Sequence, residues 1–99
     1  MEQSYTRRGF AIDQANILVK NVTSLKYPKI EFETTEGKKY ISDLSFFKKV
    51  KCFPKNQDEW NKVFATEGGY NITWSTRFEI HIFQAIEYAT SEEIIKKQA

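Results

Sequence analysis

Apolar and polar residues alternate along the middle of the chain, and this period-two pattern predicts β-strands. In residues 29–34, Ile30 and Phe32 fall on one face of an extended chain, and the charged residues between them fall on the other. Residues 39–43 have the same character, and Gly37 in between readily adopts the positive φ of a tight turn. The two segments therefore predict a hairpin with one solvent-facing side.

Three other segments also have strand character. Residues 17–25 are rich in β-branched side chains, with a break in the alternation near Thr23 that predicts a bulge. A second hairpin is expected near the end of the chain, with Ser75–Arg77 as its turn. Its inward side chains are expected to be Tyr70, Ile72, Trp74, Phe78, Ile80 and Ile82.

Helical patterns are short and few. Asn56 is a suitable cap for a helix in which Trp60, Val63 and Phe64 share a face, and we expect this helix to stop near Lys62 or Val63. A strand over residues 63–66 is the alternative there. A helical turn is expected after Asp43 (44–47), and two helical pieces near the end (85–89, and a capping box from Thr90 to Glu93).

Together these elements predict an α+β fold. We expect an antiparallel sheet of about four or five strands, with one short helix packed on a face and a C-terminal helical segment. Residues 1–12 are expected to form a flexible N-terminal arm, which Phe10 and Ile12 could dock onto the domain. Residues 13–99 are expected to form a single α+β domain, which fits the usual size of domains.

Composition narrows the class of protein. The 15 Lys and Arg residues nearly balance the 13 Asp and Glu residues, so the net charge of +2 predicts no strong general attraction to nucleic acids or membranes. One cysteine, Cys52, rules out an intrachain disulfide. The polar start of the chain and the lack of an apolar run of about 20 residues predict a cytoplasmic protein that does not insert into membranes.

Several of these features follow one another in an order that resembles the DUF2442 family of small bacterial proteins. The resemblance covers roughly residues 17–89 and includes a short helix before the final hairpin. The matching positions are Gly37, Asp43-Leu44, Ile72-Thr73-Trp74, Ala85, Ile86 and Tyr88, with Glu79 at the place of an acid in the family's final strand. Two places depart from the family pattern. Ser75–Arg77 replaces a short Asn-Gly or Asp-Gly connection, and Lys48–Lys55 is longer and more basic.

The resemblance implies a small bacterial α+β protein. It also implies a two-gene arrangement with another small protein, of the toxin–antitoxin kind. It supplies no catalytic residue.

The basic segment is the main candidate for binding. Residues 46–55 contain four lysines and no acid, interleaved with Phe46, Phe47 and Phe53. Lysines of this kind attract acidic protein segments, and with aromatic side chains they also suit nucleic acid. We predict a non-enzymatic binding or adaptor protein that acts through a protein partner, with a nucleic-acid-associated regulator as the alternative. The candidate binding residues are Lys48, Lys49, Lys51, Lys55 and Arg77.

An enzyme is the weakest of the three readings. Cys52 lies among lysines, which favour a thiolate, and His81 is the one histidine that could act as its base. His81 and Glu79 share a strand face, which suits either a His–carboxylate pair or a plain surface pair. No metal-ligand spacing or phosphate-binding loop occurs. We therefore expect no catalytic residues, no metal and no cofactor. The oligomeric state is left open.

Overall fold

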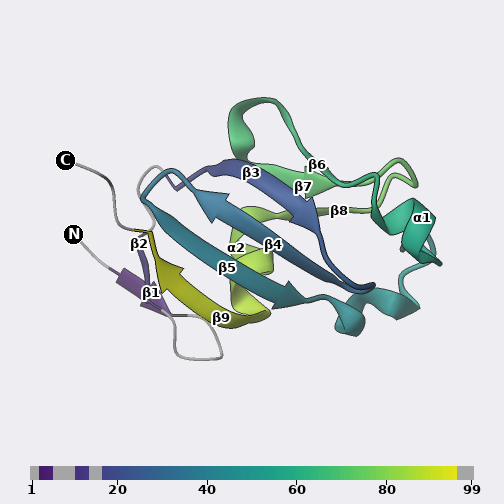
Figure 1. Ribbon diagram of the computed structural model, residues 1–99, viewed down its shortest axis with the longest axis horizontal. Coiled ribbons are helices and arrows are strands. Elements are labelled where there is room, and N and C mark those ends of the chain that lie inside the picture. Colours follow the sequence, from purple (N-terminus) through teal and green to yellow (C-terminus); the bar gives the residue numbers. More distant parts are fainter. Residues whose placement is uncertain (1–2, 6–10, 14–16, 96–99) are drawn as a thin grey trace.

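A computed structural model describes residues 3–5, 11–13 and 17–95 of the 99-residue chain. Its largest element is an antiparallel sheet in the order β3-β4-β5-β9 (Figure 1). The strands of this sheet are β3 (Val19–Ser24), β4 (Lys29–Thr34), β5 (Lys38–Asp43) and β9 (Ala89–Ile94).

A second, three-stranded antiparallel sheet lies next to β3 (Figure 1). It consists of β6 (Phe64–Ala65), β7 (Asn71–Thr73) and β8 (Glu79–His81). The helices are α1 (Gln57–Trp60), α2 (Ile82–Glu87) and the 3-10 turns η1 (Ser45–Lys49) and η2 (Glu67–Gly69). None of the helices in the described part of the chain has the length and apolar character needed to cross a membrane.

The fold is therefore α+β, as predicted. At the start of the chain, β1 (Gln3–Tyr5) and β2 (Ala11–Asp13) pair with each other. The rest of the predicted arm, including Phe10, lies outside the described residues.

The first predicted hairpin is confirmed. Strands β4 and β5 pair in register, with Phe32 opposite Tyr40, and Gly37 in their turn has a φ of 84°. The bulge in β3 was predicted at the wrong residue, because Thr23 pairs regularly with Glu31 and the register shifts between Val19 and Asn21. Lys20 is the extra residue of the bulge. Because of it, Val19 is buried while the next two residues, Lys20 and Asn21, both face solvent.

The core lies between the main sheet and the elements behind it. Helix α2 and the second sheet cover one face of the main sheet (Figure 1), and Phe32 and Tyr40 on that face are fully buried. The two tryptophans, Trp60 and Trp74, are also buried in the core. Their rings stack 4.7 Å apart, and the indole N–H of Trp74 donates to the carbonyl of Trp60 at 3.0 Å.

The end of the chain differs from the prediction. The capping-box pattern from Thr90 to Glu93 predicted a helical turn, but these residues belong to β9. Strand β5 offers a ladder of backbone hydrogen bonds there, and the Thr90 hydroxyl donates to the carbonyl of Ile41 instead of capping a helix. Lys38 also pairs with Glu92 across the two strands at 3.2 Å. Pairing over a long sequence distance thus overrides the local signal.

Two aromatic residues that were predicted to be buried are exposed. Helix α1 ends at Trp60, earlier than expected, and the alternative strand over 63–66 is confirmed as β6, where Phe64 is 52% exposed. The helical spacing that put Phe64 on the face of Trp60 therefore does not apply. Tyr70 is 57% exposed because its backbone is helical (φ −81°, ψ −29°), so it precedes the alternation of β7.

Candidate binding surface

The basic segment connects β5 to α1, and its aromatic residues fasten it to the core. The carboxylate of Asp43 accepts a hydrogen bond from the Ser45 N–H at 2.9 Å, and η1 begins at Ser45, one residue later than the predicted helical turn. Phe46 then stacks on Tyr88 with 5.2 Å between ring centres. At the other end of the segment, Phe53 is buried. The backbone of the segment is therefore held at both ends.

The four predicted lysines are all exposed along this segment. The ammonium of Lys48 lies 5.2 Å from the centre of the Tyr27 ring, and that of Lys49 lies 4.5 Å from the centre of the Phe46 ring. Such cation–π contacts fix the position of a cation without neutralising it. Lys51 and Lys55 make no ion pair with the residues that the structure describes. All four positive charges thus remain available to a ligand.

These lysines line a groove of about 520 Å³, which we call the basic groove. Its lining also includes Tyr27, Val50, Phe53 and Pro54. The Tyr27 hydroxyl donates to the Pro54 carbonyl at 2.8 Å, and its backbone N–H donates to the Gln57 side chain at 2.8 Å. The surface of the groove is therefore partly apolar and is tied together by hydrogen bonds.

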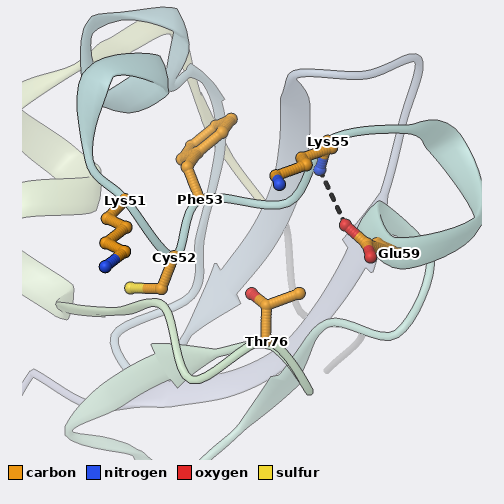
Figure 2. Close-up of a pocket in the computed structure, with 6 residues that line it drawn as sticks. All are labelled: Lys51, Cys52, Phe53, Lys55, Glu59 and Thr76. Atoms are coloured by element: carbon orange, nitrogen blue, oxygen red, sulfur yellow. Dashed lines mark hydrogen bonds between the residues drawn. The ribbon is translucent and has the colours of Figure 1, made fainter.

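A smaller hollow of about 240 Å³ adjoins the basic groove, and we call it the Thr76 hollow (Figure 2). The two share part of their lining, including Lys51 and Lys55. Cys52 and Phe53 line the hollow on the side of the basic segment, Glu59 reaches it from α1, and Thr76 comes from the opposite β7–β8 turn. Residues far apart in the sequence thus meet at one place.

The Thr76 side chain has an unusual environment. Its hydroxyl oxygen is buried and makes no hydrogen bond with the described residues. In Figure 2 the hydroxyl lies on the side of Cys52 and the methyl group on the side of Glu59. A buried hydroxyl without a partner costs free energy, and native structures contain few of them.

Arg77 follows Thr76 but lines neither the groove nor the hollow. It is exposed and has a φ of 75°, in the left-handed region that favours glycine. Its N–H donates to the Trp74 carbonyl at 3.0 Å and closes the turn. The structure therefore brings together the four lysines and places Arg77 on a turn, outside the lining of both the groove and the hollow.

Glu59 and Asn56 shape the end of the hollow nearest α1. The Asn56 side chain accepts the Glu59 N–H at 2.9 Å, which confirms the predicted helix cap. The Glu59 carboxylate accepts the backbone N–H of Lys55 at 2.8 Å (Figure 2). This second bond holds the chain where the basic segment enters the helix.

Sequence reasoning did not find Tyr27, Glu59 or Thr76 as parts of this surface. Of the three, Thr76 lay in the predicted turn of the second hairpin and Glu59 in the predicted helix after Asn56. Glu59 lies four residues from Lys55 in the same part of the chain. No local pattern could have found Tyr27 or Thr76, because each reaches the surface only through the folding of the chain.

The structure gives the surroundings of the residues that were weighed for catalysis. The Nδ1 atom of His81 accepts the Phe83 N–H at 3.1 Å, and the Gln84 side chain accepts the His81 N–H, so His81 caps α2. Glu79 accepts a hydrogen bond from Asn71 at 2.6 Å. Cys52 is half-buried and lines the Thr76 hollow, which His81 does not line. Within the described ranges, no three His, Cys, Asp or Glu residues gather as a metal site would require.

Neither a family model, nor a curated protein, nor a solved structure matches the chain. The resemblance to DUF2442 therefore stays a prediction.

Proposed function

We propose that this chain is a non-enzymatic binding protein that holds an acidic segment of a partner protein in the basic groove. The observation that carries the proposal is the groove itself, whose lining combines four exposed lysines with apolar residues that include Val50. Positive charges steer and orient an acidic partner, and the apolar residues provide contact area. An extended segment with acidic residues on both sides of an apolar one fits this arrangement.

The aromatic residues favour a protein partner over nucleic acid. Single-stranded nucleic acids stack their bases on free aromatic faces. Tyr27 packs edge-on against Trp60 at 5.4 Å and carries Lys48 over its ring, and Phe46 lies between Tyr88 and the ammonium of Lys49. The net charge of +2 is also small for a nucleic-acid-binding domain.

The cellular setting is part of the proposal. We place the protein in the cytoplasm, in keeping with its single cysteine. The resemblance to DUF2442 extends the proposal to a bacterial two-gene module in which the partner is the second product.

The proposal is tested with a fluorescent acidic peptide in which glutamates flank leucines, and with single-stranded DNA of similar length. The double substitution Lys48→Glu and Lys49→Glu should weaken peptide binding at least roughly tenfold, because two attractive charges become repulsive. The control, Lys20→Glu with Lys62→Glu, makes the same change of net charge at exposed lysines outside the groove. It should have little effect.

Fluorescence anisotropy at low and moderate salt measures both ligands. Equal losses in the two double variants would show that the groove is not the binding site. Tighter binding of the DNA than of the peptide, with a steep salt dependence, would replace the proposal with the nucleic-acid alternative.

A further inference from the structure

We propose that the Thr76 hollow is an oxyanion site that takes the phosphate group of a phosphorylated residue in the partner segment. The inference rests on the proposed function, because it concerns the same partner. It goes further in naming a chemical group and the residues that recognise it. The acidic segment would lie in the basic groove, and the phosphate would enter the adjoining hollow.

The unpartnered hydroxyl of Thr76 is the first argument. A buried hydroxyl normally finds a hydrogen-bond partner, and Thr76 has none among the described residues. Figure 2 places this side chain in the wall of the hollow, opposite the basic segment. One staggered step about its Cα–Cβ bond moves the hydroxyl to the position that the methyl group now occupies. In that rotamer the hydroxyl can donate a hydrogen bond to an oxyanion in the hollow.

The number of possible donors is the second argument. Lys51, Lys55 and Thr76 all line the hollow, so its lining contains three side chains that can donate hydrogen bonds. A phosphate ester presents three oxygens that accept strong hydrogen bonds, whereas a carboxylate presents two. The hollow therefore matches a phosphate better than it matches the side chain of an aspartate or glutamate.

The size and position of the hollow agree with this ligand. Its volume of about 240 Å³ leaves room for a phosphate group. Lys51 and Lys55 belong to both the hollow and the basic groove. A segment bound in the groove can therefore direct one side chain into the hollow without leaving the lysines.

Glu59 sets the charge of the hollow and provides a sharp test. Its carboxylate opposes the two lysines and leaves a sum of one positive charge (+2 − 1). Glu59→Gln removes the negative charge but keeps an oxygen that can accept the Lys55 N–H. The variant should therefore bind an anion more tightly. A cation site would respond in the opposite direction.

The first experiment uses inorganic phosphate and follows backbone amide shifts by NMR at constant ionic strength. We expect saturable shifts at residues 51–53, 55 and 75–77 with phosphate, and none with acetate. Thr76→Val should weaken phosphate binding roughly tenfold, as expected for one hydrogen bond to a charged group, and Thr76→Ser should preserve it. Glu59→Gln should strengthen it.

The second experiment compares a short acidic peptide with its phosphoserine form. Thr76→Val should remove the preference for the phosphorylated peptide and leave binding of the unmodified peptide unchanged. The double substitution Lys48→Glu and Lys49→Glu should weaken both peptides but spare inorganic phosphate. These variants therefore distinguish a failure of peptide binding in the basic groove from a failure of phosphate binding in the Thr76 hollow.

Several results would overturn the inference. These are equal affinities for the two peptides, phosphate binding that Thr76→Val does not change, and tighter phosphate binding after loss of Lys51 or Lys55. Shifts that grow linearly with phosphate and also appear with acetate would mean general ion screening, and would equally reject the site.

Discussion

Two threonines in the same hairpin have opposite hydrogen-bonding environments. The hydroxyl of Thr73 is buried and donates to the Phe78 carbonyl at 2.9 Å. The hydroxyl of Thr76 is also buried but has no partner in the described part of the chain. Since the two residues are so close in the chain, they form a natural pair for measuring what an unpaired hydroxyl costs.

Replacing either threonine by valine should therefore change stability in opposite directions. Thr76→Val removes an unpaired hydroxyl and should raise the free energy of unfolding by about 1 kcal/mol. Thr73→Val breaks a satisfied bond and should lower it by about 1 kcal/mol. Urea unfolding followed by circular dichroism measures both. A loss of stability in Thr76→Val as large as that in Thr73→Val would mean that its hydroxyl is bonded in solution.

The same contrast explains how far single residues were predictable. The exposed lysines and the role of Asn56 as a helix cap follow from local chemistry, and both were predicted. Thr76 and Tyr27 belong to the surface because the chain brings distant turns together, and no spacing in the sequence encodes that meeting. Phe64 was predicted to be buried because a helical period was extended past the end of the helix at Trp60.

At the scale of elements, the contact between η2 and β3 depends on a glycine. Gly69 has a φ of 77°, and a Cβ atom on it would lie 2.7 Å from the Val19 carbonyl oxygen. Gly68 also has a positive φ, of 86°, but its Cβ would meet only the Tyr70 ring at 3.1 Å. Tyr70 is exposed and can turn away, whereas the backbone of β3 cannot.

Alanine substitutions at the two glycines should therefore differ. Gly68→Ala should lower the free energy of unfolding by about 1 kcal/mol, the usual cost of a positive φ in a residue with a side chain. Gly69→Ala should cost about 2 kcal/mol more, because a backbone contact must also move apart. Thermal unfolding compares the two variants. Equal losses would show that β3 is free to shift away from η2.

Element prediction succeeded where contacts are local. The β4–β5 hairpin follows from alternation and one glycine, so its strands were located correctly. Strand β9 pairs with β5 at positions such as Ile41 and Ser91, which lie 50 residues apart (91 − 41), and the sequence near Ser91 favoured a helix. The contacts between β3 and the second sheet likewise cannot be predicted from a local pattern.

At the scale of the whole molecule, the main sheet buries a titratable residue. Tyr40 is fully buried and stacks on Phe32, with 5.3 Å between ring centres. Burial raises the pKa of the Tyr40 hydroxyl well above its ordinary value of 10, and the negative charges of Glu92 and Glu36 raise it further. The folded state thus keeps a proton that the unfolded chain releases near pH 10.

Global stability should therefore fall as the pH rises above 10. The unfolded state ionises first, so the contribution of Tyr40 is fully present below pH 10 and is lost above it, by up to about 1.4 kcal/mol per pH unit. Tyr40→Phe should have a shallower decline over the same range. Urea unfolding between pH 8 and about 11 tests this. Parallel curves for the two proteins would mean that Tyr40 ionises equally in both states.

The stacked tryptophans connect the two parts of the proposed site. Trp60 touches Phe53 and Tyr27 beneath the basic segment, and Trp74 begins the turn that carries Thr76. Two indole rings 4.7 Å apart couple their electronic transitions, so the pair is an intrinsic optical reporter. A ligand that displaces the basic segment or the turn that carries Thr76 changes the near-ultraviolet circular dichroism and the fluorescence emission of the pair. Occupancy can thus be followed on the unlabelled chain.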